Sequence, residues 1–241
     1  MGRKWNNIKY GKASKDAARS KIYARFGKEI YMAAKNGEPD VALNGNLASV
    51  VDRAKVAAVP RDIIDRAINK AKSGATENYE PIRYEGYGPA GSAIIVDALT
   101  DNVNRTVAEV RSAFKKNDGN MGVSGAVAFM FEPTALFVFN GSDEEEILEG
   151  LMEADVDVRD VEADGEYISV TADQDQFKAV QIALEGMEIT EFEEADLTML
   201  PTTTNELTGE ELEKFMKLLD ALEGLDDVTN VHHNVVFSGE E

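Results

Sequence analysis

The sequence predicts an α+β protein of three domains: an N-terminal three-helix bundle, a middle α+β domain and an inserted ferredoxin-like βαββαβ domain. Up to Gly74, apolar residues recur every three to four positions, which is typical of amphipathic helices. From Ile82 onward they alternate, as in strands. The stretch 133–201 has the order strand, helix, strand, strand, helix, strand, which is the split βαβ unit. The expected domains are 1–80, 81–132 with 202–241, and 133–201.

The N-terminal bundle is predicted from three amphipathic stretches, over 14–36, 46–58 and 60–74. In the first, Ile22, Phe26 and Ile30 form an apolar stripe, and the opposite face is basic. Pro60 suits the first turn of the third helix, and Gly74 suits its end.

The middle domain is predicted from strands on both sides of the inserted segment. Strands are expected over 82–87, 92–99, 127–131 and 228–237, and 201–205 reads as a linker. Two helices are expected here, with capping boxes formed by Thr106 with Glu109 and by Thr208 with Glu211.

The inserted domain has the most regular pattern of the chain. Its strands are expected over 135–139, 156–161, 167–171 and 189–197, and its helices over 143–154 and 174–185. Ser142 and Glu145 have capping-box spacing, and Asp164-Gly165 suits the tight turn between the central strands.

Charge is distributed unevenly along the 241 residues. The whole chain has a net charge of −20. Residues 1–35 hold ten basic and two acidic side chains, whereas residues 117–241 hold four basic and 32 acidic ones. Such asymmetry indicates that one end contacts nucleic acid or another anionic surface. For most of the carboxylates, solubility is the simpler explanation.

The composition excludes several classes of protein. The chain has no cysteine, which rules out disulfides and thiolate chemistry, and no apolar run long enough for a membrane span. His232 and His233 are adjacent in a strand, so they point to opposite faces and make a poor metal pair. We therefore expect a cytoplasmic protein that is not an enzyme and has neither a cofactor nor a metal site.

Two polar segments leave alternatives open. The glycine-rich run 119–125 lacks the Gly-Lys-Ser/Thr of a phosphate-binding loop, and a tight connection needing positive φ is the better explanation. The second segment forms an anion or interdomain site, or only caps a helix. Its residues are Asn102, Asn104, Arg105 and Thr106.

The strongest functional candidate is the basic N-terminal segment, where cations alternate with amides and aromatic rings. Lys and Arg neutralise phosphates, and Trp can stack on unpaired bases. The alternative is a solvated basic helix with Trp5 packed on its own bundle. The predicted nucleic-acid-binding residues are Arg3, Lys4, Trp5, Asn6, Asn7, Lys9, Lys12, Lys15, Arg19, Lys21, Arg25 and Lys28.

Several long motifs, in order over nearly the whole chain, resemble the YebC/PmpR family. They lie at 4–9, 53–55, 60–68, 84–89, 99–111 and 119–125. The resemblance implies the same three domains. The short start Met1-Gly2-Arg3-Lys4-Trp5 is similar to that of the YeeI-like branch, and relatives include the mitochondrial translational activator of cytochrome c oxidase.

The resemblance also implies a function. It points first to a DNA-binding transcriptional regulator, and alternatively to a factor that associates with the ribosome or ribosomal RNA and relieves stalling at consecutive prolines. The implied partners are nucleic acid, as DNA or ribosomal RNA, and the ribosome. No membrane partner is implied, and the oligomeric state stays open between a monomer and a weak dimer.

Overall fold

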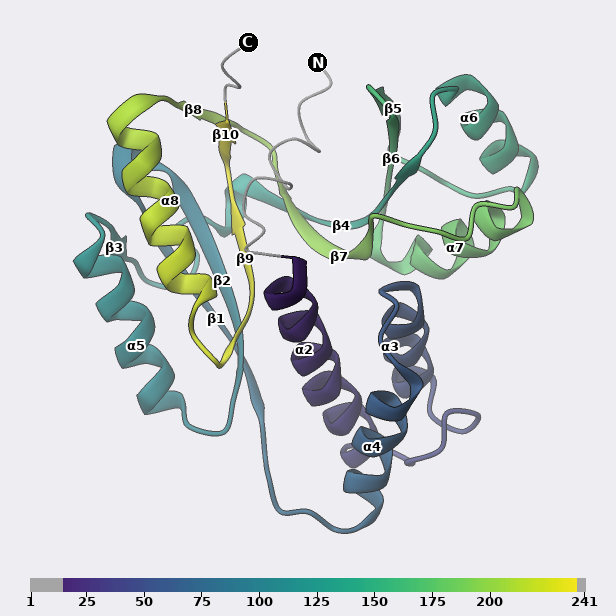
Figure 1. Ribbon diagram of the computed structural model, residues 1–241, viewed down its shortest axis with the longest axis horizontal. Coiled ribbons are helices and arrows are strands. Elements are labelled where there is room, and N and C mark those ends of the chain that lie inside the picture. The colour runs from purple at the N-terminus through teal and green to yellow at the C-terminus, as the bar shows by residue number, and fades with distance from the viewer. Residues whose placement is uncertain (1–14, 238–241) are drawn as a thin grey trace.

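The computed structural model describes residues 15–237, with side chains from residue 19 onward, and its architecture is α+β (Figure 1). Three helices open it: α2 (Lys15–Lys35), α3 (Gly45–Val56) and α4 (Arg61–Lys72). They pack around Phe26, Ile30 and Leu47, all fully buried. Asn44 joins two of them, because its amide donates to the carbonyls of Ala33 and Glu38 while its Oδ1 caps α3.

A second part is built on a four-stranded antiparallel sheet of order β3-β1-β2-β9. Its strands are β1 (Glu80–Tyr87), β2 (Ala93–Thr100), β3 (Asn120–Met121) and β9 (Val228–His233). Helices α5 (Val103–Lys116) and α8 (Gly209–Glu223) cover one face, with Phe114 and Phe215 in the shared core. The other face turns toward α2 and the second large sheet (Figure 1).

The second large sheet has the order β5-β6-β4-β7 and is also antiparallel. Its elements are β4 (Phe131–Asn140), α6 (Glu144–Glu153), β5 (Asp160–Asp164), β6 (Tyr167–Ala172), α7 (Phe177–Gly186) and β7 (Glu194–Pro201). Phe137 and Phe139 of β4 point to the helix side, where Leu151 and Leu184 complete the core. This strand order places the first strand of the unit in the middle, with the helices on one face.

The predicted last strand is divided at Asn234. Before it, β9 pairs with β2; after it, β10 (Val235–Phe237) pairs in parallel with β8 (Asn205–Leu207), a strand that was not predicted and that begins at the last residue of the predicted linker. The buried Asn234 side chain accepts a hydrogen bond from the N–H of Ala93 at 2.8 Å. The side-chain amide of Asn234 takes the place of a backbone acceptor for the N–H of Ala93. The chain can therefore pass from one sheet to the other at this residue.

The predicted strand over 127–131 is wrong. Residues Ala128–Met130 form a short 3-10 turn, and β4 begins at Phe131 and continues through the segment predicted over 135–139. The cause is Glu85, whose carboxylate accepts hydrogen bonds from the N–H groups of Gly125, Val127 and Ala128 at 2.7 to 2.8 Å. Those donors are therefore not available to a strand partner.

Two of the predicted helix starts also differ. Asn102, not Thr106, caps α5 by accepting from the N–H of Arg105, and Asp143, not Ser142, caps α6. Thr106 is fully buried one turn inside α5. In both cases an Asx side chain, Asn102 one turn earlier or Asp143 one residue later, accepts from a backbone N–H of the first turn, and the helix starts there.

The glycine-rich connection needs its glycines for two reasons. Gly125 has φ of +84°, as predicted, whereas a Cβ at Gly119 would lie 2.9 Å from the ring of Phe114. Asp118 takes the left-handed conformation at the end of α5, with φ of 57°. Close approach of the loop to the core, more than positive φ, therefore explains Gly119.

Candidate nucleic-acid interface

The predicted basic segment is only partly within the described residues. Arg3, Lys4, Trp5, Asn6, Asn7, Lys9 and Lys12 lie outside them, and Lys15 is described only by its helical backbone in α2. Arg19 and Lys21 are exposed on the first turns of α2. Burial lowers the pKa of Lys21, an effect that Glu223 and Asp226 partly offset.

Arg25, further along α2, does not face solvent. Its guanidinium pairs with Asp196 of β7 and donates to Asn230 Oδ1 of β9 at 2.7 Å. The side chains of Arg25 and Asp196 are only 10% and 14% exposed. Burial by itself would raise the pKa of Asp196, but Arg25 and Arg53 outweigh it and lower that pKa.

Arg53 of α3 completes the same cluster. Its guanidinium donates to Asp196 at 3.0 Å and to Glu29 of α2 at 2.9 Å. We call Arg25, Glu29, Arg53 and Asp196 the ionic junction. It joins the helices to both large sheets, and so we assign Arg25 to this joint and remove it from the predicted nucleic-acid surface.

Lys28, another predicted contact, is likewise held by the chain. Its ammonium lies 3.5 Å from Asp227 Oδ1 and donates to the carbonyls of Leu99 and Asp226. Asp227 also accepts from Arg105 and Thr106, at 2.6 and 2.8 Å. The chain's own carboxylate therefore lies where the sequence suggested an anion or interdomain site. Asn102 caps α5 and Asn104 is exposed.

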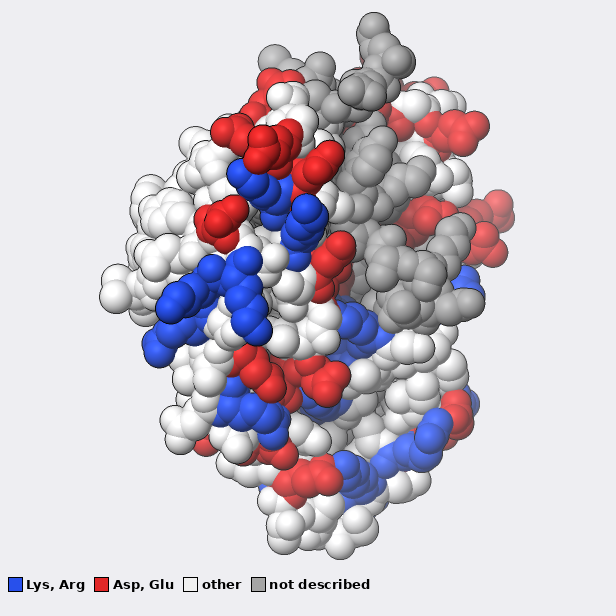
Figure 2. Space-filling view, turned by 60° about the vertical axis from the view of Figure 1, so that its left-hand side comes forward, with Lys and Arg blue, Asp and Glu red and all other residues white. Residues whose placement is uncertain are grey.

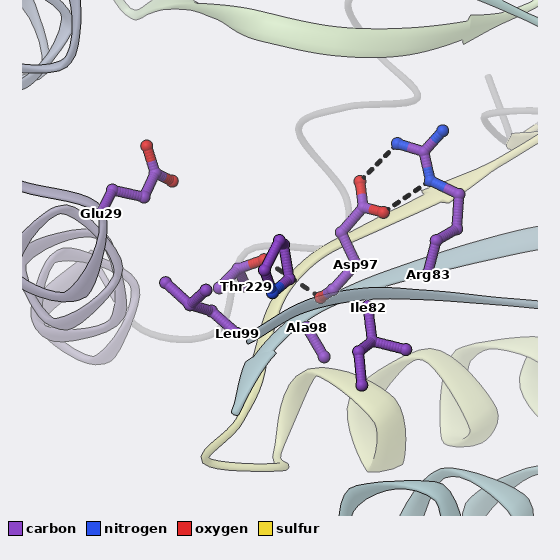
Figure 3. A pocket seen from close by; sticks show the side chains of 8 residues that line it. Glu29, Ile82, Arg83, Asp97, Ala98, Leu99 and Thr229 are labelled. Carbon is purple, nitrogen blue, oxygen red and sulfur yellow. Dashed lines mark hydrogen bonds and ion pairs between the residues drawn. The ribbon is translucent and has the colours of Figure 1, made fainter. Parts of the chain in front are cut away.

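A cleft of about 420 Å³ separates α2 from the sheet beside this cluster (Figure 3). Glu29 projects from α2 on one side, and Arg83 and Asp97 project from the sheet on the other (Figure 3). Arg83 binds both oxygens of Asp97, at 2.7 and 2.9 Å, and His232 Nε2 lies 3.2 Å away from the same carboxylate.

The charges of this cleft are satisfied within the protein. Burial opposes ionisation of Asp97, but His232 and Arg83 outweigh it and lower its pKa to about 2. His233 points to the opposite face, as expected, and packs against Phe215 and Phe237. Arg83, Asp97 and His232 therefore tie neighbouring strands of the sheet to one another, and the Arg83 cation that lines the cleft is paired.

Four side chains that the sequence did not single out line a hollow between α2 and α4. Tyr23 lies one turn after Arg19 on α2, Arg66 and Lys70 lie one turn apart on α4, and Tyr79 follows α4. The hollow has a volume of about 350 Å³, and we call it the α2–α4 hollow. Arg66 and Lys70 are four residues apart, so they share one face of the predicted helix, and Tyr79 follows that helix. This combination is a signal in the sequence that could have identified them.

The face formed by α5 and α8 does not have the separation of charge that the sequence shows between its two ends. Figure 2 shows basic and acidic side chains interspersed over this side of the molecule. Arg111, Lys115 and Lys116 of α5 are exposed there, as are Glu211 and Asp220 of α8. The net charge of a sequence segment therefore does not equal the charge of a surface.

The described part of the chain has neither a grouped set of metal-binding side chains nor a helix suited to span a membrane. Within residues 15–237, no three or more His, Asp or Glu side chains are grouped so that they could hold a metal ion. No helix in the same range combines the length and the apolar character needed to cross a membrane.

Comparison with known proteins gives a consistent family. Residues 3–74 match the model of the TACO1/YebC protein N-terminal domain, and residues 79–235 match that of the TACO1/YebC second and third domain. The crystal structure of a conserved hypothetical protein from Aquifex aeolicus is similar, with a TM-score of 0.79 and 36% identity over 95% of each chain. The chain belongs to the TACO1/YebC family.

Proposed function

We propose that this protein is a non-enzymatic, nucleic-acid-binding regulator of gene expression that contacts RNA through its helical N-terminal part and acts in translation. One observation carries this proposal: exposed cations of α2 and α4 border partly exposed tyrosines on one surface. Arg19 supplies a phosphate contact on α2, with Tyr23 one turn after it, and Arg66 and Lys70 are the exposed cations of α4. Cations combined with aromatic faces are typical of single-stranded nucleic-acid binding.

The described helices favour RNA over the major groove of a DNA duplex. A recognition helix needs several free side chains that reach base edges. On α4, Arg61 and Arg66 pair with Asp65 and Asp62, and on α2 the ionic junction occupies Arg25, so these side chains are not free to reach base edges. Recognition of RNA by shape, phosphates and unpaired bases does not require such a helix.

The second candidate is the DNA-binding transcriptional regulator that the sequence resemblance implied. The observation in its favour is the length of α2, because 21 residues are long enough to lie along a groove. Both candidates predict weaker binding when Lys4, Lys9, Lys12 and Arg19 are reversed in charge.

A sucrose gradient of cell lysate separates the two candidates. If the protein acts in translation, it migrates with ribosomes, and the peak survives DNase and is lost in the charge-reversed variant. A specific promoter footprint without a ribosome peak would contradict the RNA proposal. Ribosome profiling of a deletion strain then tests the translational role: pauses at consecutive prolines without changes in transcript level are the expected result.

We propose that the chain forms three domains, bounded at 1–80, 81–132 with 202–241, and 133–201, because separate apolar clusters lie in each part. We also propose that the chain belongs to the YeeI-like branch that its sequence resembles. A role on ribosomes or DNA supports a cytoplasmic location and needs no cofactor.

A further inference from the structure

The α2–α4 hollow has a floor of small residues. Ala24 and Gly27 of α2 and Ala67 of α4 line it, and a Cβ on Gly27 would have no neighbour closer than Ile63 Cγ2, at 3.9 Å. Packing therefore does not require glycine at this position. A glycine inside a helix costs roughly 1 kcal/mol relative to alanine, so its presence leaves space at a cost in stability.

Aromatic rings stand at the wall of the hollow and are held in place. Tyr31 is buried, and its hydroxyl donates to the carbonyls of Ala75 and Glu77, at 3.0 and 2.7 Å. Tyr79 packs edge-on against Tyr31, with ring centroids 6.0 Å apart. Tyr79 and Tyr23 both remain partly exposed. A partly exposed ring that is held in place, as Tyr79 is by Tyr31, can stack with a base at little entropic cost.

Cations border the same space. The Lys70 ammonium lies 5.3 Å from the ring of Tyr31, and Lys28 lies 5.4 Å from that of Tyr79. Lys70 pairs with Glu77, and Arg66 pairs with Asp62, but the Arg66 and Lys70 side chains are 73% and 45% exposed. Exposed pairs of this kind contribute little to stability, and so a phosphate can replace the carboxylate.

From this arrangement we infer that the α2–α4 hollow binds one unpaired nucleotide of an RNA strand. The base enters over Gly27 and stacks on Tyr23 or Tyr79, and Arg66 and Lys70 contact its phosphate. This inference rests on the proposed function and specifies where, and in which form, RNA is read. A paired base cannot enter, because both its faces are stacked and its edge is bonded.

The test compares variants that fill or strip the hollow. Gly27→Leu fills it, and Tyr23→Ala removes a stacking surface. Gly45→Leu is the matched control, because Gly45 starts α3 and a Cβ added there would have no atom within 4 Å. Circular dichroism and thermal melts of the full-length variants check that each one folds. The probes are a fluorescent single-stranded oligouridine and the same strand paired with oligoadenosine.

We expect Gly27→Leu and Tyr23→Ala each to weaken binding of the single strand by roughly tenfold and to leave duplex binding within about twofold. Gly45→Leu should match the wild type on both probes. Two results would overturn the inference and leave the proposed function standing. One is single-strand binding that neither hollow variant changes, and the other is an equal loss of binding to the single strand and the duplex. Absence of wild-type binding to either probe would contradict both.

Discussion

At the residue scale, single carboxylates decide local structure that hydrophobic patterns do not predict. Glu85 is 4% exposed, and its three backbone donors hold residues 125–128 out of a strand. Burial acts to raise its pKa, but the backbone donors outweigh burial and the pKa is lowered. The alternation of Val127, Phe129 and Phe131 is present in the sequence; the competing acceptor, 40 residues earlier, is not visible there.

Replacing Glu85 with Gln should destabilise the protein by about 1–3 kcal/mol, because one acceptor oxygen becomes an NH₂ group facing backbone N–H donors. Urea denaturation of both proteins measures this difference. Glu80→Gln, at the exposed start of the same strand, is the control and should have little effect. Equal stability of the two variants would show that the Glu85 contacts do not hold the loop.

Glu223, in the last turn of α8, makes stability depend on pH. Burial raises its pKa from 4.5 to about 7, although Lys21 partly offsets this. Between these two values the folded state binds more protons than the unfolded state, so the free energy of unfolding falls as pH rises. Charging Glu223 in its half-buried site is the unfavourable step.

The Glu223→Gln variant should therefore gain stability relative to wild type as the pH rises from about 5 to about 8. Chemical denaturation at both pH values measures the difference, and Glu213→Gln on the exposed side of α8 serves as the control. A gain of the same size at both pH values would rule out titration of Glu223 as its cause.

At the element scale, α2 has two roles on two faces. Its apolar stripe packs in the helical core, as predicted, but its basic face is divided between exposed cations near the start and the ionic junction farther on. Sequence periodicity gives which residues share a face of a helix; it does not give which other element covers that face. Strand β8 was missed for the same reason: three residues form a strand only because β10 lies beside them.

Asp196→Asn should destabilise the protein by about 3–5 kcal/mol, because it leaves the two buried guanidinium groups of Arg25 and Arg53 with a single carboxylate, that of Glu29. The matched control is Asp173→Asn, which removes an exposed pair with Arg159 and should cost less than about 1 kcal/mol. Guanidinium or urea titrations compare them. A loss for Asp196→Asn no larger than the control's would mean that the ionic junction contributes little to holding the parts together.

At the scale of the whole molecule, part of the charge asymmetry is internal. Basic residues before 117 meet acidic residues after it: Arg25 and Arg53 bind Asp196, and Lys28 and Arg105 bind Asp227. Lys178 of α7 pairs in the reverse direction with Asp52 of α3. Some of the basic character read as a nucleic-acid surface therefore joins the N-terminal helices to the rest of the chain.

RNA binding should nevertheless depend strongly on salt. If six cations contact phosphates of a single strand, the log–log slope of affinity against salt is about −4. Charge reversal of Lys4, Lys9, Lys12 and Arg19 should flatten that slope, whereas Lys217→Glu on the exposed face of α8 should leave it unchanged. Fluorescence titrations over a range of salt concentrations measure both, and a wild-type slope near zero would exclude phosphate contacts as the source of affinity.

The sequence by itself determined the helices, most strands and the α+β class, because hydrophobic period and glycine positions act within a few neighbours along the chain. It also located the basic segment that includes Arg19 and Lys21. Only the tertiary structure decided which of those cations are free. Asp196 lies 171 residues from Arg25, and whether two such distant charges meet depends on how separate sheets and helices pack.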